Sequence, residues 1–113
     1  KDRKLKPSTL LKCIEIKKNM GWCDDIKFPK KYNKLIRIEK KIKHEKLNRK
    51  DHKYDLLIPI KYNYKKPVNG LGSCIFLHLT KDYKPTAGCV ALKEKDFLIM
   101  LKLIKKNTKI KIF

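Results

Sequence analysis

Residues 73–92, SCIFLHLTKDYKPTAGCVAL, place an apolar segment, a polar loop and a second short apolar segment in direct succession. The first segment, residues 73–79, has the length and composition of a buried central strand. Residues 80–88 contain Pro85 and Gly88 and are typical of a loop. The fold is therefore expected to form around the strand that carries His78.

A helix is predicted on the carboxyl-terminal side of this stretch, over residues 93–105. Acidic Glu94 and Asp96 lie in its first turn, where the helix dipole favours negative charge. Its apolar residues recur at helical spacing, and they are Phe97, Leu98, Met100, Leu101 and Ile104. Asn107-Thr108 should end the helix, and the alternation in residues 109–113 predicts a last strand.

On the amino-terminal side, apolar residues predict short strands at 10–16, 35–38 and 54–60, the last with Pro59 at an edge or bulge. Residues 21–25, GWCDD, resemble a turn, and the polar residues 44–51 are expected to form one or two helical turns on the surface. The expected fold is one mainly β domain with one helix.

The charge of the chain is high: its 113 residues carry 31 Lys and Arg against 11 Asp and Glu, a net charge of +20. Such a charge suggests nucleic-acid binding. However, Arg3, Arg37 and Arg49 are the only arginines, and Arg is the residue best suited to reading base edges. The charge is also uneven, at +14 in residues 1–66 but only +1 in residues 67–101. A dedicated nucleic-acid binder is therefore not the favoured interpretation, and no stretch approaches the roughly 20 apolar residues of a membrane-spanning helix.

Candidate chemistry lies at the two ends of the loop, where His78 precedes it and Gly88-Cys89 follows it. A cysteine nucleophile needs a nearby base, because an isolated thiol with a pKa of about 8.5 is mostly protonated at neutral pH. His78 can supply that base. A glycine before the nucleophile permits a tight turn and lets backbone N–H groups face an oxyanion. The alternative from these residues alone is a buried cysteine and a core histidine.

The segment His78, Thr86-Ala87-Gly88-Cys89 and Val90 resembles the active-site motif of the L,D-transpeptidase (YkuD-like) catalytic domain family, in which a strand-borne His precedes Ser/Thr-x-Gly-Cys. Residues 21–25, 44–47, 54–56 and 72–79 look like further blocks of one bacterial branch, and residues 108–112 resemble its closing strand. The chain departs from the family pattern at Ala87, where a His is common, and at Leu79, where a Gly is common. The Arg or Asn often found shortly after the Cys is also missing.

The resemblance implies an L,D-transpeptidase-like β-sandwich or barrel with one helix after the catalytic Cys. It implies that residues 1–113 are a single catalytic domain lacking its amino-terminal strands. The activity implied is peptidoglycan cross-linking: Cys89 is acylated by a stem tetrapeptide with His78 as general base and acid, and an amine of another stem resolves the thioester. Gly88 and Ala87 would hold the oxyanion through their backbone, and Tyr83 and Thr86 would line the substrate groove. No cofactor or metal is implied, and the location implied is the cell envelope.

The remaining cysteines, histidines and tyrosines have simpler interpretations. Cys74 and Cys13 are interpreted as core residues, and Cys23 as structural or disulfide-bonded, since none of the four cysteines has metal or redox spacing. The group His44, His52, Asp51 and Asp55 matches no zinc signature and is interpreted as charged surface. Tyr62, Tyr64 and Tyr83 alternate with Lys, a pattern compatible with base stacking or with a sugar and peptide groove.

Three alternative functions remain open at this stage. An L,D-carboxypeptidase would use water to resolve the thioester, and a non-catalytic envelope-binding module would have kept the fold without the activity. A basic nucleic-acid binder is the third, and it would show strong salt dependence.

Overall fold

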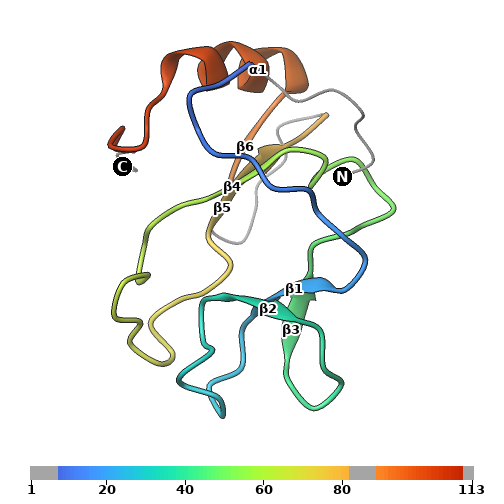
Figure 1. The fold of residues 1–113 in the computed structure, drawn as a ribbon, viewed down its shortest axis with the longest axis vertical. Helices are drawn as coiled ribbons and strands as arrows, with labels where there is room; N and C mark the ends of the chain where they lie inside the picture. Colours follow the sequence, from blue (N-terminus) through green and yellow to red (C-terminus); the bar gives the residue numbers. More distant parts are fainter. Residues whose placement is uncertain (1–7, 82–88, 111–113) are drawn as a thin grey trace.

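The computed structural model describes residues 8–81 and 89–110. These residues form two three-stranded sheets and one helix. One sheet lies in the middle, with the helix on one side of it and the other sheet on the opposite side (Figure 1). The elements in chain order are β1 (Met20–Cys23), β2 (Leu35–Arg37), β3 (His44–Lys46), β4 (Leu57–Pro59), β5 (Phe76–Leu79), β6 (Val90–Leu92) and α1 (Glu94–Leu103). The fold is mainly β with one helix, as the sequence predicts.

The first sheet has the order β2-β1-β3, and both pairings are antiparallel. Trp22 of β1 lies opposite Leu35 on one side and opposite Glu45 on the other. A side chain at Gly21 would be crowded, because a Cβ there would lie 3.0 Å from Ile38 Cγ1. Glycine at this position therefore permits the strands to approach closely.

The second sheet has the order β4-β5-β6, with β5 at its centre. β4 pairs antiparallel with β5, whereas β6 pairs parallel, with Leu77 opposite Val90 and His78 opposite Ala91. Every residue of β5 is buried. Pro59 lies in the edge strand β4, where its missing N–H costs no ladder hydrogen bond.

Two hydrophobic clusters lie on opposite faces of β5, because successive side chains of a strand alternate between faces. Phe76 packs with Trp22, Leu47 and Tyr54 in the first cluster, towards the first sheet. Leu77 and Leu79 pack with Phe97 and Leu101 of α1 in the second cluster. The helix thus covers one face of the second sheet, and the first sheet covers the other.

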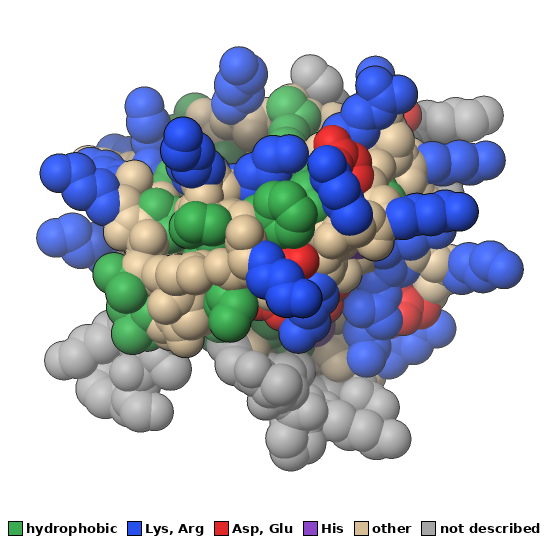
Figure 2. Space-filling view, turned by 90° about the horizontal axis from the view of Figure 1, so that it is seen from below, with side chains coloured by type: hydrophobic (Ala, Val, Ile, Leu, Met, Phe, Trp, Pro, Cys, Tyr) green, Lys and Arg blue, Asp and Glu red, His purple; other side chains and the backbone are tan. Residues whose placement is uncertain are grey.

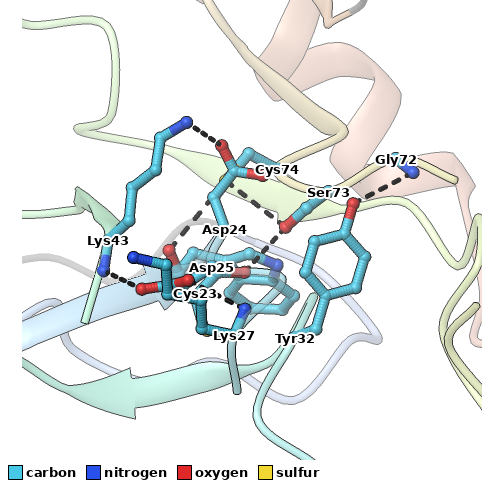
Figure 3. A network of polar contacts seen from close by, with 10 residues as sticks. Cys23, Asp24, Asp25, Lys27, Tyr32, Lys43, Gly72, Ser73 and Cys74 are labelled. Carbon is cyan, nitrogen blue, oxygen red and sulfur yellow. Dashed lines mark hydrogen bonds and ion pairs between the residues drawn. The ribbon is translucent and has the colours of Figure 1, made fainter. Parts of the chain in front are cut away.

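Polar contacts fix the segment before β5 to the end of β1 (Figure 3). The Ser73 hydroxyl donates a hydrogen bond to the Cys23 carbonyl at 2.8 Å, and the Gly72 amide donates one to the Tyr32 hydroxyl at 3.1 Å. Asp25 accepts hydrogen bonds from the amides of Lys27 and Lys43, both at 2.9 Å. These contacts set the position from which β5 enters the core.

Several element predictions are wrong. Residues 10–16 form no strand, and Leu10 and Ile14 are 74% and 63% exposed. The segment expected as a turn, residues 21–25, contains most of β1, because its residues find pairing partners on both sides. The segment expected as helical turns, residues 44–51, contains β3 instead. Residues 109 and 110 belong to no strand, and residues 111–113 lie outside the described residues.

The remaining strand and helix predictions are confirmed with shorter limits. β2, β4 and β5 lie within the predicted ranges 35–38, 54–60 and 73–79, and α1 lies within 93–105. No helix in the described part of the chain has the length and apolar character needed to cross a membrane. Many Lys and Arg side chains project from the face seen in Figure 2, with hydrophobic side chains between them.

Candidate active site

His78 lies in β5, Cys89 directly precedes the parallel neighbour strand β6, and the two residues face the same side of the second sheet. Leu77 is opposite Val90, so Cys89, one residue earlier, is level with Phe76. Phe76 and His78 are two residues apart and therefore face the same side. Cys89 packs against the cluster that contains Phe76, which places it on that side too. Strand spacing and rise put the Cα atoms of His78 and Cys89 roughly 8 Å apart, a separation that two converging side chains can bridge.

The orientation of the His78 ring is set by a backbone carbonyl. His78 is 6% exposed, and its Nδ1 lies 2.8 Å from the Leu79 carbonyl oxygen. Because a carbonyl can only accept, Nδ1 must carry the proton, and the lone pair of the neutral ring is on Nε2. The ring also packs edge-on against Tyr54, with centroids 5.5 Å apart. This contact thus fixes the tautomer of the neutral ring, in which Nε2 is the basic atom.

The Cys89 thiol is half-buried and lies against the backbone of the segment that leads into β5. Its Sγ accepts a hydrogen bond from the Phe76 amide at 3.4 Å and donates one to the Cys74 carbonyl at 3.2 Å. Burial raises the pKa of the Cys89 thiol, the Phe76 N–H opposes that rise, and the negative charge of Glu45 adds to it. The Cys89 sulfur is therefore a neutral thiol at rest, and it would need a base to take its proton before it could act as a nucleophile.

Tyr54 and Glu45 lie beside the two candidate catalytic residues. Tyr54 is 3% exposed and contacts the rings of Phe76 and His78. Its pKa is raised first by burial and then by the charge of Glu45 and a hydrogen bond with it. Arg49 covers the Tyr54 ring, with Cζ 4.9 Å from the ring centroid, and pairs with Asp51 at 2.6 Å. Tyr54 is thus held in its phenol form between the guanidinium and the imidazole.

The sequence pattern does not single out Glu45, because residues 44–51 are mostly polar and predict a surface segment. One signal was available: Leu47 lies two residues after Glu45, and in a strand these two residues share a face. The role of the Leu79 carbonyl carries no sequence signal, since every residue has a carbonyl.

Cys74 has a backbone conformation that few residues other than glycine adopt, with φ of 59°. Burial, together with the charges of Glu45 and Asp24, raises the pKa of its thiol to about 12. A hydrogen bond with the Ser73 side chain partly opposes this rise. Its thiol is therefore inert at neutral pH, and its carbonyl is the group that contacts Cys89. Cys74 packs against the first cluster, in keeping with its interpretation as a core residue.

The remaining cysteines, Cys23 and Cys13, are not part of the candidate active site. Cys23 is fully buried and its carbonyl accepts the Ser73 hydroxyl. Cys13 is exposed, so its interpretation as a core residue is wrong. The four cysteines, all within the described part of the chain, form no disulfide with one another.

Four predicted site residues, Tyr83, Thr86, Ala87 and Gly88, lie outside the described residues. Tyr62 and Tyr64 are 46% and 39% exposed on the segment after β4. His44, His52, Asp51 and Asp55 form no metal-binding group, and no three potential ligands come together elsewhere in residues 8–81 and 89–110.

In a comparison with protein families, residues 18–112 match the family model YkuD, described as the L,D-transpeptidase catalytic domain. The match includes both sheets, the helix, His78 and Cys89. Comparisons with curated proteins and with solved structures give no match.

Proposed function

Because the chain belongs to the L,D-transpeptidase catalytic domain family, we propose that it is a peptidoglycan L,D-transpeptidase of the cell envelope, with Cys89 as nucleophile and His78 as general base and acid. The observation that carries the proposal is that these two side chains share one face of the parallel β5–β6 pair, with His78 in β5 and Cys89 directly before β6. The Nδ1 contact with the Leu79 carbonyl supports it, because it leaves Nε2 available as the base.

In the first half of the reaction, the thiol proton of Cys89 moves to His78 Nε2 as Sγ attacks the carbonyl of the third residue of a stem tetrapeptide. The bond from this carbonyl carbon to the nitrogen of the terminal D-Ala then breaks, and His78 gives its proton to the departing amine. The product is a thioester on Cys89. Backbone N–H groups at Ala87 and Gly88 are the predicted oxyanion donors.

In the second half, a side-chain amine of another stem attacks the thioester carbonyl. His78 takes a proton from that amine, the C–S bond breaks, and the proton returns to the Cys89 thiolate. The new amide is a cross-link between two stems. If water attacks instead, the same steps release a shortened stem, which is L,D-carboxypeptidase action.

Covalent labelling tests the nucleophile. A carbapenem should add once to the wild-type protein, as seen by intact-mass spectrometry, and the adduct should be absent in Cys89→Ala. Cys13→Ala is the matched control, because it removes an exposed thiol that has no place in the site, and it should label as the wild type does. An unlabelled wild-type protein, or a labelled Cys89→Ala variant, would overturn the proposal.

The fate of the thioester separates cross-linking from carboxypeptidase action. The acylated protein is mixed with an acceptor stem that carries a free side-chain amine, and the products are separated by chromatography. A dimer linked through that amine supports the transpeptidase, whereas a hydrolysed stem alone assigns the chain to the carboxypeptidase alternative.

A further inference from the structure

The Glu45 side chain points into the apolar layer that contains Cys89. Glu45 is directly opposite Trp22 in the β1–β3 pairing, and paired residues of adjacent strands share a face. Leu47, two residues later, shares that face as well. Trp22 and Leu47 are both members of the first hydrophobic cluster, against which Cys74 and Cys89 pack. A carboxylate thus enters the space between the two sheets, beside the candidate nucleophile.

One oxygen of this carboxylate is left unsatisfied. Oε2 of Glu45 is buried and has no hydrogen-bond partner within the described part of the chain. Buried polar atoms are nearly always hydrogen-bonded, because leaving one without a partner costs the free energy of its lost hydration. Oε2 can therefore accept a hydrogen bond from a donor outside the described residues, such as a bound ligand.

Among the described residues, Arg49 is a cation whose charge interacts with that of Glu45. Arg49 also lies over the Tyr54 ring and is bonded to Asp51 at 2.6 Å, so it is shared between several partners. The other titratable neighbours, Tyr54, Cys74 and Cys89, are neutral when protonated, and Glu45 raises the pKa of each. A negative charge here opposes formation of the Cys89 thiolate, so its presence beside a nucleophile needs a reason.

We propose that Glu45 binds the side-chain ammonium group of the diamino acid whose carbonyl Cys89 attacks. This inference rests on the proposed function, and it makes Glu45 a substrate-binding residue that selects a cationic donor. The ammonium donates the hydrogen bond that Oε2 lacks, and its charge offsets the field that hinders loss of the Cys89 proton. The donor amine fits better than the acceptor amine, because a carboxylate stabilises the protonated amine, which cannot attack a thioester.

The first experiment compares two stem tetrapeptides that differ at one group, the side-chain amine of the third residue, which is free in one and acetylated in the other. The rate of thioester formation is followed by intact-mass spectrometry. The wild type should prefer the free amine by roughly ten- to a hundredfold, the value of one charge-assisted hydrogen bond. Glu45→Gln should lower the rate with the free amine and reduce the preference to within about threefold.

Glu39→Gln is the matched control for the loss of a carboxylate. Glu39 lies on the surface between Lys31 and Lys41, at 3.9 Å from each, and should keep the wild-type preference. An equal preference in the wild type and Glu45→Gln would overturn the proposal, and so would a wild type without preference, which would show that water alone satisfies Oε2.

The second experiment needs no catalytic activity and so separates the two proposals. Alkylation of Cys89 by the cation 2-bromoethylammonium is compared with alkylation by neutral iodoacetamide, with peptide mapping to isolate Cys89 from the other thiols. The ratio of the two rates should fall several-fold in Glu45→Gln and stay constant in Glu39→Gln. If neither peptide acylates the wild type, the proposed function fails, while an unchanged alkylation ratio rejects the ammonium site itself.

Discussion

At the scale of single residues, His78 and Cys89 owe their chemistry to backbone groups. The Leu79 carbonyl selects the His78 tautomer, and the Cys74 carbonyl and the Phe76 amide hold the Cys89 sulfur. The sequence marks both residues by their types and by the glycine before Cys89. It does not say which ring nitrogen is basic, since this depends on where a carbonyl lies after folding.

The assignment of His78 predicts the behaviour of His78→Asn. The Asn amide N–H can take the place of Nδ1–H towards the Leu79 carbonyl, so the melting temperature should change little. The variant lacks a base, and the rate of Cys89 acylation by a tetrapeptide should fall by about 10²- to 10⁴-fold.

His44→Asn is the control for this substitution. Its Nδ1 also lies 2.8 Å from a backbone carbonyl, that of Ile42, but His44 neighbours Glu45 in the strand and points to the opposite face. Acylation in this variant should match the wild type. Wild-type acylation in His78→Asn would remove His78 from the mechanism.

At the scale of elements, β5 and α1 position the site together. β5 is buried on both faces, one by the first sheet and the other by the helix. The predicted limits of β5 and α1 are close to those observed because apolar runs and helical spacing are local properties. The sequence does not predict β1 and β3, because a short segment that contains Gly21 and a polar segment become strands only through pairing with their neighbours.

Packing of α1 against β5 predicts unequal effects on the two sides of the helix. Phe97 is 1% exposed in the second cluster, and Phe97→Ala should lower the free energy of unfolding by about 3–5 kcal/mol. Ile99, on the same helix, is 52% exposed. Ile99→Ala should therefore change the free energy of unfolding by less than about 0.5 kcal/mol. Urea denaturation measures both, and equal losses would contradict the packing of the helix described here.

At the scale of the whole molecule, protonated groups are enclosed between the two sheets. The folded state raises the pKa of the Cys74 thiol to about 12, chiefly by burial, and burial raises that of Cys89 as well. The unfolded thiols ionise near pH 8.5. Above about pH 8.5, the unfolded state therefore binds fewer protons than the folded state. The stability that these thiols contribute is fully present below about pH 8.5 and is lost as the pH rises towards their pKa values in the folded state.

Denaturation at several pH values between 7.5 and 10.5 should therefore show that the free energy of unfolding falls as the pH rises. This fall should be smaller in Cys74→Ala than in the wild type. The difference between variant and wild type isolates the thiol from the titration of the many lysines. Cys13→Ala is the control, because Cys13 is exposed and should leave the slope unchanged. An identical pH slope in Cys74→Ala and the wild type would show that the fold does not protect this thiol from ionisation.

The sequence by itself determined the mainly β class with one helix, the buried strand around His78, and the family to which residues 18–112 belong. These follow from local apolar patterns and from a short motif. Only the tertiary structure decided that the Glu45 side chain points into the layer between the sheets where Cys89 lies. It also decided that the Leu79 carbonyl orients the His78 ring. The reason is physical: strand pairing between distant segments sets the face to which Glu45 points, and the contact of the His78 ring with the carbonyl of its neighbour Leu79 depends on a backbone and ring geometry that no local pattern encodes.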